Sequence, residues 1–225
     1  MHCCAKNGDI MLERMDKFFE NRLSGYDEHM LTELEGSTEF YKFTASLLPK
    51  APFAEVLDLG IGTGLEMEEY FLLNPEAQIT GIDLSAAMLG ALKAKFPDKS
   101  LNLFCASYFD TDLGFEKFDA AVSVESLHHF RAEKKLSLYR KLRRSLKTGG
   151  FFVLTDYFAE SDALEKEYFE TLERLKAEQG ISDDEFYHYD TPLTYVHETE
   201  ILREAGFSQV EILKNWNSTY TLLAK

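Results

Sequence analysis

Residues 55–66, with the sequence EVLDLGIGTGLE, constrain the fold of this chain more than any other stretch. A short apolar run ends around Asp58, and three glycines then alternate with Ile61 and Thr63 ahead of a segment with helical spacing. Glycine lacks a Cβ, so the backbone can turn sharply here and a ligand can lie against it. The first turn of the following helix offers unpaired N–H groups. The stretch therefore predicts a strand, a tight turn and a helix that bind a nucleotide-like cofactor.

The same alternation continues along the middle of the chain. Apolar runs typical of strands occur at four further places, residues 78–83, 101–105, 118–124 and 151–156. The third of these is apolar almost throughout, as expected of a parallel strand that is buried on both faces. We therefore expect a doubly wound α/β domain, in which ligands bind at the carboxyl ends of the strands. Asp58, Asp83 and Glu125 fall at such ends.

Helical spacing at the N-terminal end predicts two helices, over Asp9–Leu23 and Asp27–Leu48, and residues 1–8 are expected to be disordered. Within residues 1–50 these helices either form a cap or pack on the sheet like the other helices. We expect residues 51–225 to form the main, cofactor-binding domain.

The C-terminal third has a different character. A charged helix is predicted over Glu160–Gln179, and an acidic, aromatic and irregular stretch follows it at residues 182–193. We interpret these segments as a helical insertion at about residues 160–195 of the main domain. The last elements predicted are a helix and two strands that pair antiparallel, at residues 198–205, 207–213 and 217–223.

The net charge of the chain indicates which class of substrate it can bind. With 24 basic and 39 acidic residues the net charge is −15, which disfavours a nucleic-acid substrate because phosphate contacts require a basic surface. The basic residues at positions 134–147 have helical spacing, so we interpret them as a solvated helix face. Neither a bilayer-spanning apolar segment nor a signal-peptide core is found, and Cys3, Cys4 and Cys105 make no disulfide framework. These features predict a cytoplasmic protein that does not enter the membrane, and they are compatible with a homodimer.

The glycine spacing distinguishes two kinds of cofactor. A dinucleotide-binding fold requires a glycine where this chain has Leu65, and here the third glycine comes one residue early, at Gly64. That spacing, after Asp58, resembles the first motif of the class I S-adenosylmethionine-dependent methyltransferases. The resemblance continues through residues 81–85, 88–89, 118–123, 127–130, 146–150 and 205–207. It implies a seven-stranded, mostly parallel sheet with helices on both faces and an antiparallel seventh strand. It also implies the cofactor S-adenosylmethionine (SAM) and methyl transfer to an acceptor, which we expect to be a small molecule.

The resemblance implies a role for each cofactor-binding residue. Asp83 would accept hydrogen bonds from both ribose hydroxyls, whereas the alternative role of capping the next helix suits Ser85 better. Asp58 and the amides of the turn would hold the ammonium and carboxylate of the methionine part, unless the Asp58 carboxylate bonds only to those amides. Ser107 stands where the family usually carries an acid for the adenine amino group. The implied cofactor contacts are Tyr26, Asp58, Gly60, Ile61, Gly62, Thr63, Gly64, Asp83, Leu84, Met88, Ala106, Ser107, Tyr108, Val124 and Glu125.

Glu125 and His129 are the candidate catalytic residues, because they follow the fourth strand and would line the methyl-transfer side of the site. His129 matches a histidine that many members of the family carry, and it can contact the cofactor or remove a proton from the acceptor. The pair also has the spacing of two metal ligands, but a third ligand is needed and His188 and His197 lie in unmatched contexts, so no metal site is expected. His128 is expected to pack or cap.

The insertion resembles one subgroup more closely. Residues 164–180 and His197 match the arrangement of the carboxy-S-adenosylmethionine synthases, which supply a cofactor for tRNA wobble-uridine modification. Those enzymes hold the extra carboxylate with an arginine after the insertion, whereas residues 183–196 here contain no Lys or Arg. We therefore expect ordinary SAM, with the synthase and a non-catalytic SAM-binding protein as alternatives. Five aromatic residues either line an acceptor pocket or belong to the core: Tyr157, Phe158, Phe186, Tyr187 and Tyr189.

Overall fold

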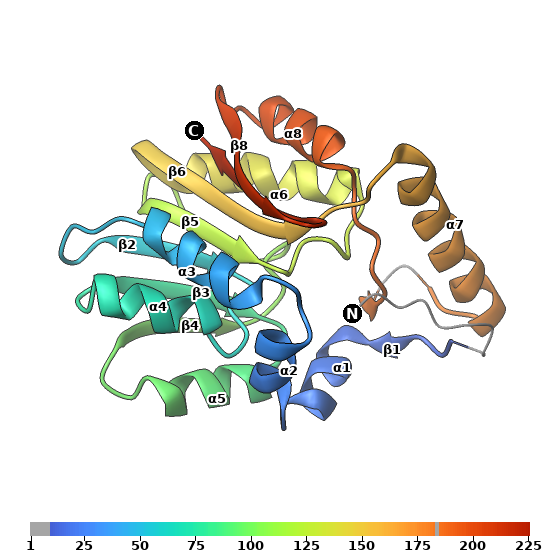
Figure 1. The fold of residues 1–225 in the computed structure, drawn as a ribbon, viewed down its shortest axis with the longest axis horizontal. Coiled ribbons are helices and arrows are strands. Elements are labelled where there is room, and N and C mark those ends of the chain that lie inside the picture. Colours follow the sequence, from blue (N-terminus) through green and yellow to red (C-terminus); the bar gives the residue numbers. More distant parts are fainter. Residues whose placement is uncertain (1–9, 183–184) are drawn as a thin grey trace.

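A seven-stranded sheet forms the centre of the molecule (Figure 1), shown by a computed structural model that describes residues 10–182 and 185–225. Its strands, in spatial order, are β4 (Ser100–Cys105), β3 (Gln78–Asp83), β2 (Glu55–Leu59), β5 (Phe118–Val124), β6 (Leu146–Tyr157), β9 (Thr219–Ala224) and β8 (Val210–Trp216). The last strand, β9, runs antiparallel to both of its neighbours, and the other adjacent pairs are parallel. The predicted doubly wound sheet and its antiparallel seventh strand are thus confirmed. The strand order reverses between β2 and β5, where such folds bind ligands.

Helices cover both faces of the sheet. The helices α3 (Ser37–Leu47), α4 (Leu65–Leu73) and α5 (Ala86–Lys95) pack on one face, and α6 (Ala132–Ser145) and α8 (Tyr195–Glu204) pack on the other. Successive side chains of a strand point to opposite faces, so Val56 belongs to the core beneath α3 and α4 while Leu57 belongs to the core beneath α6. The sheet is therefore buried on both sides, as the apolar β5 sequence predicted.

The first N-terminal helix is shorter than predicted. Helix α1 spans Met15–Arg22, because Glu13–Arg14 form a short strand, β1, that pairs antiparallel with β7 (Tyr187–His188). The prediction of a helix from Asp9 is wrong over residues 10–14, and the disorder predicted for residues 1–8 lies outside the described residues.

The second predicted N-terminal helix is broken in two. Helix α2 (Tyr26–Thr32) ends before Gly36, which has a φ of 78° and precedes α3. A Cβ on Gly36 would lie 2.6 Å from Cδ1 of Trp216, so the close approach of β8 requires glycine at this break. A separate cap within residues 1–50 stays a prediction, although α3 shares its core with β2 and α4.

The insertion contains α7 (Asp162–Gln179), which extends away from the sheet in Figure 1. The stretch predicted to be irregular contains β7, and residues 183–184 within it are not described. The late helix begins at Tyr195, three residues earlier than predicted, where the Thr194 hydroxyl caps it. His197 of α8 lies 2.8 Å from a carboxylate oxygen of Glu165, which connects α8 to α7.

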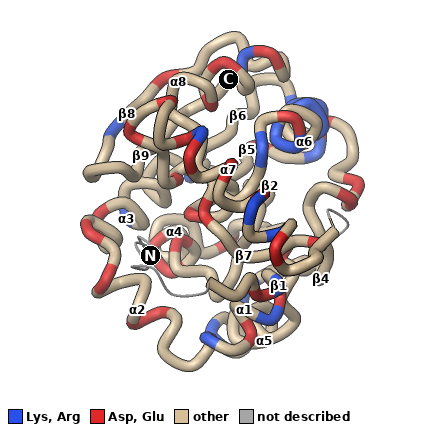
Figure 2. Tube along the Cα trace, turned by 90° about the vertical axis from the view of Figure 1, so that its right-hand side faces the viewer, with Lys and Arg blue, Asp and Glu red and all other residues tan. Residues whose placement is uncertain are grey.

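Basic residues are concentrated on α6, as Figure 2 shows, but they do not all face solvent. Lys135 is 1% exposed, and its Nζ lies 2.6 Å from Oε2 of Glu198. Lys141 donates to the main-chain carbonyls of Tyr108, Phe109 and Thr111. The prediction of a solvated helix face is wrong for Lys135, because a charged partner that lies far away in the sequence stabilises the buried ammonium.

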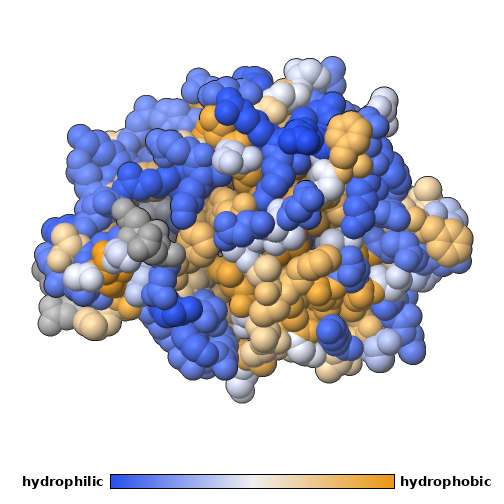
Figure 3. Space-filling view, turned by 180° about the vertical axis from the view of Figure 1, so that it is seen from behind, coloured by the Kyte–Doolittle hydropathy of each residue, from blue (hydrophilic) through white to orange (hydrophobic). Residues whose placement is uncertain are grey.

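The surface seen in Figure 3 is mainly hydrophilic, with its largest apolar area in the lower centre and smaller apolar patches elsewhere. Among the described residues, the exposed large apolar side chains include Phe53, Leu72, Phe104 and Phe115. No described helix combines the length and the apolar character that crossing a bilayer requires.

Candidate active site

The glycine turn after β2 has the conformation that its sequence predicted. Gly60, Gly62 and Gly64 all have positive φ, of 81°, 51° and 73°. A Cβ on Gly60 would lie 2.0 Å from Oγ of Ser126, so this position also lacks the space for a side chain. The backbone of the turn is therefore held close to the chain that follows β5.

Asp83 at the end of β3 fixes the turn from the other side. Its Oδ2 accepts a hydrogen bond from the Gly62 N–H at 2.9 Å, and its Oδ1 accepts one from the Ser85 N–H at 2.8 Å. Burial raises the pKa of the carboxyl although these hydrogen bonds oppose the change. The Ser85 hydroxyl caps α5 by accepting from the Met88 N–H, which leaves the Asp83 carboxylate beside the site.

Behind the turn lies an acidic pair without a cation. Asp58 is 1% exposed and Glu66 is 5% exposed. Neither carboxylate oxygen of Asp58, nor Oε1 of Glu66, accepts a hydrogen bond from a described residue. Burial, together with the neighbouring Glu66, raises the pKa of Asp58 well above its usual range, and burial raises the pKa of Glu66 to about 7. The alternative in which Asp58 bonds only to the amides of the turn does not describe this structure.

A small cleft of about 50 Å³ lies at the carboxyl ends of β2, β3 and β5. Its lining residues are Met15, Phe19, Tyr26, Gly60, Gly62, Asp83, Leu84, Met88, Tyr108, Val124, Glu125, Ser126 and His129. Ten of these are predicted site residues, so the structure brings most of the prediction together at one edge of the sheet.

Six predicted cofactor residues do not line the cleft: Asp58, Ile61, Thr63, Gly64, Ala106 and Ser107. The Ser107 hydroxyl accepts a hydrogen bond from the Phe109 N–H at 3.1 Å, so it is engaged in the turn after β4. The Ile61 side chain packs against Gly81, at which a Cβ would lie 2.7 Å from it. These residues shape the walls of the site from behind.

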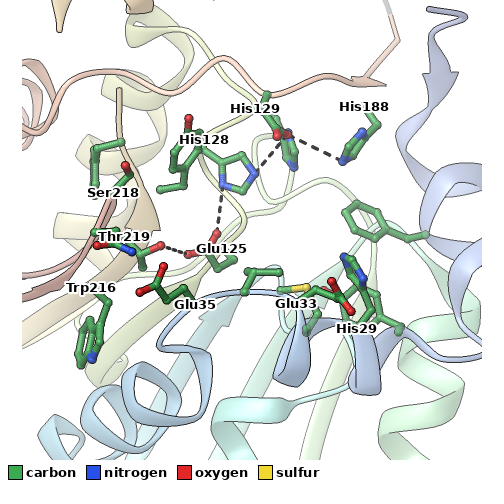
Figure 4. Close-up of a pocket in the computed structure, with 18 of the residues that line it drawn as sticks. His29, Glu33, Glu35, Glu125, His128, His129, His188, Trp216, Ser218 and Thr219 are labelled. Carbon is green, nitrogen blue, oxygen red and sulfur yellow. Dashed lines mark hydrogen bonds and ion pairs between the residues drawn. The ribbon is translucent and has the colours of Figure 1, made fainter. Parts of the chain in front are cut away.

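A much larger cavity, of about 1270 Å³, adjoins the small cleft (Figure 4). Tyr26, Glu125 and His129 line both spaces. The large cavity draws its remaining walls from distant segments, at residues 18–35, 157–160, 188–190 and 216–220. Tyr157 and Phe158 line it, whereas Phe186 packs against Phe109 and Phe130. Of the aromatic residues left open by the sequence, Tyr157 and Phe158 therefore border the cavity.

The large cavity is lined by several acidic side chains. Glu33, Glu35, Glu125, Glu160 and Asp190 line it. Arg22 is the only Lys or Arg among the described lining residues, and its guanidinium lies 2.9 Å from Glu13 and over the ring of Phe18. The acidic walls are thus not balanced by a free basic side chain.

Glu125 sits at the junction of the two spaces in an unusual conformation. Its φ is 48°, and its main-chain N–H donates to the Thr155 carbonyl at 2.9 Å. Burial raises the pKa of the carboxyl to about 7, with a further contribution from Asp156. The Thr219 hydroxyl donates to Oε1 of Glu125 at 3.1 Å. A carboxyl with such a pKa can exchange a proton near neutral pH.

The two adjacent histidines have different surroundings. His128, and not His129, is the histidine near Glu125, with 4.0 Å between its Nδ1 and a carboxylate oxygen. Burial alone would lower the pKa of His128, but Asp156, whose Oδ1 is 2.5 Å from Nδ1, and Asp190 raise it to about 10. Burial and the charge of His128 lower the pKa of His129, which favours a neutral imidazole. The sequence predicts only a packing or capping role for His128, but its ring nitrogens lie within 4.0 Å of three carboxylates, those of Glu125, Asp156 and Asp190.

Sequence reasoning missed several residues of this region, namely Glu66, Asp156, His188 and Asp190. The sequence did indicate Asp156, because this residue lies near the end of a predicted strand as Asp58 and Asp83 do. His188 has its ring centroid 4.8 Å from that of His129, although its place in the sequence gave no indication of this contact.

Comparison with known proteins indicates the family. Residues 56–150 match a family model described as a methyltransferase domain. The chain is 25% identical to the carboxy-S-adenosyl-L-methionine synthase of Campylobacter fetus, covering 95% of both proteins. It is 29% identical to the synthase of Wolinella succinogenes, covering 95% of this chain and 91% of that protein. Over these residues the chain is similar to the class I S-adenosylmethionine-dependent methyltransferases.

Solved structures share the fold of this methyltransferase at low identity. A complex of DhpI with S-adenosylhomocysteine (SAH) superimposes with a TM-score of 0.69 at 16% identity and covers 93% of both chains. A protein of Nostoc punctiforme, provisionally described as an O-methyltransferase, gives a TM-score of 0.69 at 20% identity. The chain covers 62% of the length of that protein.

The cofactor of this methyltransferase is SAM, and the residues present suit it. The oxygens of Asp58 lack donors, and the ammonium of the methionine part would supply them. Gly60 and Gly62 line the cleft together with Asp83, so a ligand there lies against the backbone of the turn. A ligand that is cationic at one end and carries hydroxyls at the other therefore fits this edge of the sheet.

Proposed function

We propose that this methyltransferase transfers the methyl group of SAM to a small-molecule acceptor bound in the large cavity. The observation that carries the proposal is the junction of the two spaces, because Tyr26, Glu125 and His129 border both of them. Pockets for small molecules commonly measure about 300–1,000 Å³, and the large cavity, at about 1270 Å³, has room for such an acceptor. The acidic lining and the net charge of −15 argue against RNA or DNA at this site.

In this proposal the cofactor is held by the residues of the small cleft and its walls. Asp83 accepts from the ribose hydroxyls, and the Asp58–Glu66 pair attracts the ammonium from behind the turn. Leu84, Met88 and Tyr108 surround the adenine, since all three line the cleft. The predicted contacts from Ala106 and Ser107 would then be limited to the rim.

The chemistry requires alignment, exclusion of water and removal of one proton. SAM supplies an electrophilic methyl carbon, and holding the acceptor in line with it is worth ~7–11 kcal/mol. Tyr26 covers the junction from the side of α2 and excludes water. Glu125 and the neutral His129 both lie where a proton leaving the acceptor has to go, and either can accept it near pH 7.

A synthase of carboxy-SAM is the second candidate, favoured by the names of the curated relatives at 25–29% identity. Such a cofactor carries one more carboxylate, and a buried carboxylate requires a cationic partner. The described lining residues of the large cavity include one Arg or Lys, Arg22, which Glu13 already pairs. His128 is likewise held between Asp156 and Asp190. The charge balance therefore favours ordinary SAM.

The test uses SAM labelled in its methyl group. The purified protein is incubated with the low-molecular-mass fraction of a cell extract, with total RNA and with total protein in separate reactions. We expect label only in the low-mass fraction, together with release of SAH, and loss of the label transfer in the Glu125→Gln variant. Label in RNA or protein would contradict a small acceptor. SAM binding without SAH release in any fraction would favour a non-catalytic protein, and mass spectrometry of a co-purifying carboxylated cofactor would favour the synthase.

A further inference from the structure

Three histidines meet at one carboxylate oxygen on the wall of the large cavity. The distances to Oδ1 of Asp190 are 3.3 Å from Nδ1 of His129, 3.6 Å from Nε2 of His128 and 3.9 Å from Nε2 of His188. Figure 4 shows the three histidines next to one another along one side of the pocket, and the ring centroid of His129 lies 4.0 Å from that of His128 and 4.8 Å from that of His188. We propose that His128, His129, His188 and Asp190 bind a divalent transition-metal ion of the zinc class.

The spacing of the four side chains suits such an ion. Ligands on a tetrahedral ion with bonds of ~2.1 Å lie about 3.4 Å apart. The three distances to Asp190 bracket this value, and the ligand atoms of His128, His129 and Asp190 all lie within 4.8 Å of one another. Small side-chain rotations therefore suffice to bring these three donors around one ion, whereas His188 lies outside this group and has to move further to become the fourth ligand.

Residues around the cluster orient its histidines as metal sites require. Asp156 accepts from Nδ1 of His128, which leaves Nε2 facing Asp190, and histidine ligands usually have such a carboxylate behind them. The second oxygen of Asp156 is fixed by the Leu127 N–H at 2.8 Å. The ring of His188 is stacked on Phe18 with 3.4 Å between the centroids. The nitrogen of His129 that faces Asp190 also lies 3.3 Å from the Tyr189 carbonyl, a contact that the ion would replace.

The donor set selects the class of metal. Three imidazoles and one carboxylate suit Zn²⁺, Co²⁺, Ni²⁺ or Fe²⁺, whereas Mg²⁺ and Ca²⁺ prefer oxygen ligands. His128 and His129 are each 8% exposed, which limits competition from water on their side of the ion, whereas the Asp190 side chain is partly exposed to the cavity. The competing explanation is a network of hydrogen bonds and ion pairs that holds no ion.

The ion would connect two parts of the chain. His128 and His129 follow β5, whereas His188 belongs to β7 in the insertion, so metal binding would fasten the insertion to the sheet. An ion at this place would also occupy His129, which leaves Glu125 as the proton acceptor of the proposed reaction. That second consequence rests on the proposed function, but metal binding itself does not.

The test measures metal binding without cofactor or acceptor. The full-length protein is dialysed against a chelator and then titrated with Zn²⁺ by calorimetry and with Co²⁺ by visible absorption. We expect one ion per chain, the intense absorption of Co²⁺ with fewer than six ligands, and a higher melting temperature with Zn²⁺. Asp156→Asn should weaken binding by ~10–100-fold, and His188→Gln and His129→Gln should weaken it at least as much.

His29→Gln is the matched control, because His29 also lines the large cavity but lies outside the cluster. It should leave the affinity for Zn²⁺ unchanged. SAH binding by each variant, measured separately, reports whether the fold is intact. Less than one ion per chain, or equal affinity in wild type, His188→Gln and His129→Gln, would overturn the metal site. Because no methyl transfer is measured, these results are independent of whether the proposed function holds.

Discussion

Two buried acidic groups in this molecule are equally hidden from water and differ in their partners. Glu198 of α8 is 0% exposed, and it accepts hydrogen bonds from the Lys135 ammonium at 2.6 Å and from the Tyr139 hydroxyl. Asp58 and Glu66 are 1% and 5% exposed, and no basic side chain donates to either oxygen of Asp58. The Lys135 ammonium compensates the charge of Glu198, whereas Asp58 has no such partner among the described residues.

The difference separates a structural interaction from a binding site. Lys135 and Glu198 connect α6 to α8 and border neither cavity, so their pairing stabilises the packing of two helices. The acidic pair behind the glycine turn costs free energy in the unliganded protein, because burial disfavours the charged carboxylate. A cationic ligand removes that cost. Buried charge without a partner thus marks the part of the fold that ligand binding completes.

The largest effect is expected from removing the cation that compensates Glu198. Lys135→Met leaves Glu198 buried and unpaired, and loss of one partner of a buried ion pair typically costs 3–5 kcal/mol, so we expect a decrease of about 4 kcal/mol in the free energy of unfolding. Urea unfolding at pH 7 measures it. The double variant Lys135→Met, Glu198→Leu should recover most of the loss, and a single-variant loss below about 1 kcal/mol would show that the pair does not matter for stability.

For Asp58 and Glu66, removing a buried charged group should stabilise the protein instead of destabilising it. The gain in the free energy of unfolding should also depend on pH. Because folding raises the pKa of Glu66 from 4.5 to about 7, the folded protein keeps a proton that the unfolded chain has released. The stability contributed by this proton is complete below pH 4.5 and decreases as pH rises toward 7. Glu66→Gln should therefore increase the free energy of unfolding at pH 8, by at most about 3 kcal/mol.

Urea unfolding of wild type and Glu66→Gln at pH 5 and pH 8 provides the comparison. The advantage of the variant should be clearly smaller at pH 5 than at pH 8. Equal stability of the two proteins at pH 8 would show that the buried carboxyl carries no such cost.

A smaller effect is expected on ligand binding. Asp58→Asn removes the charge that attracts the cofactor ammonium, and charge-assisted hydrogen bonds contribute about 1.5–3 kcal/mol, so SAM should bind roughly 10–100-fold more weakly. The stability of the unliganded variant should be unchanged or higher. Isothermal titration calorimetry with SAM gives the affinity, with Asp119→Asn as the control because Asp119 pairs with Lys147 and lines neither cavity. An affinity within twofold of wild type would exclude Asp58 from cofactor binding.

The cofactor end of the fold could be predicted because its information is local. Positive φ at Gly60, Gly62 and Gly64 follows from glycine spacing within five residues, and Asp83 follows from the end of an apolar run. Strand and helix periodicity then predicted the succession of strands and helices along the chain. Each of these signals lies within a short segment, so folding does not have to bring distant residues together before they can be recognised.

The acceptor end could not be predicted in the same way, since distant segments build it. His128 meets Asp156 and Asp190, which lie near the end of β6 and beyond β7. The spacing of Lys135 to Leu138, Tyr139 and Leu142 puts it on the apolar face of α6, but its partner Glu198 lies on a distant helix and could not be read from this segment. Gly36 likewise lies at the break of a predicted helix, where Trp216 of β8 leaves no room for a Cβ. Contacts of this kind depend on the finished packing.

The short ladder between β1 and β7 has a consequence for the walls of the two spaces. It joins the start of α1 to the segment that carries His188, and the Met15 N–H adds a hydrogen bond to the Phe186 carbonyl at 2.9 Å. Met15 borders the small cleft, while His188 borders the large cavity. The ladder therefore couples a wall residue of one space to a wall residue of the other, so a displacement of either segment is transmitted directly to its neighbour.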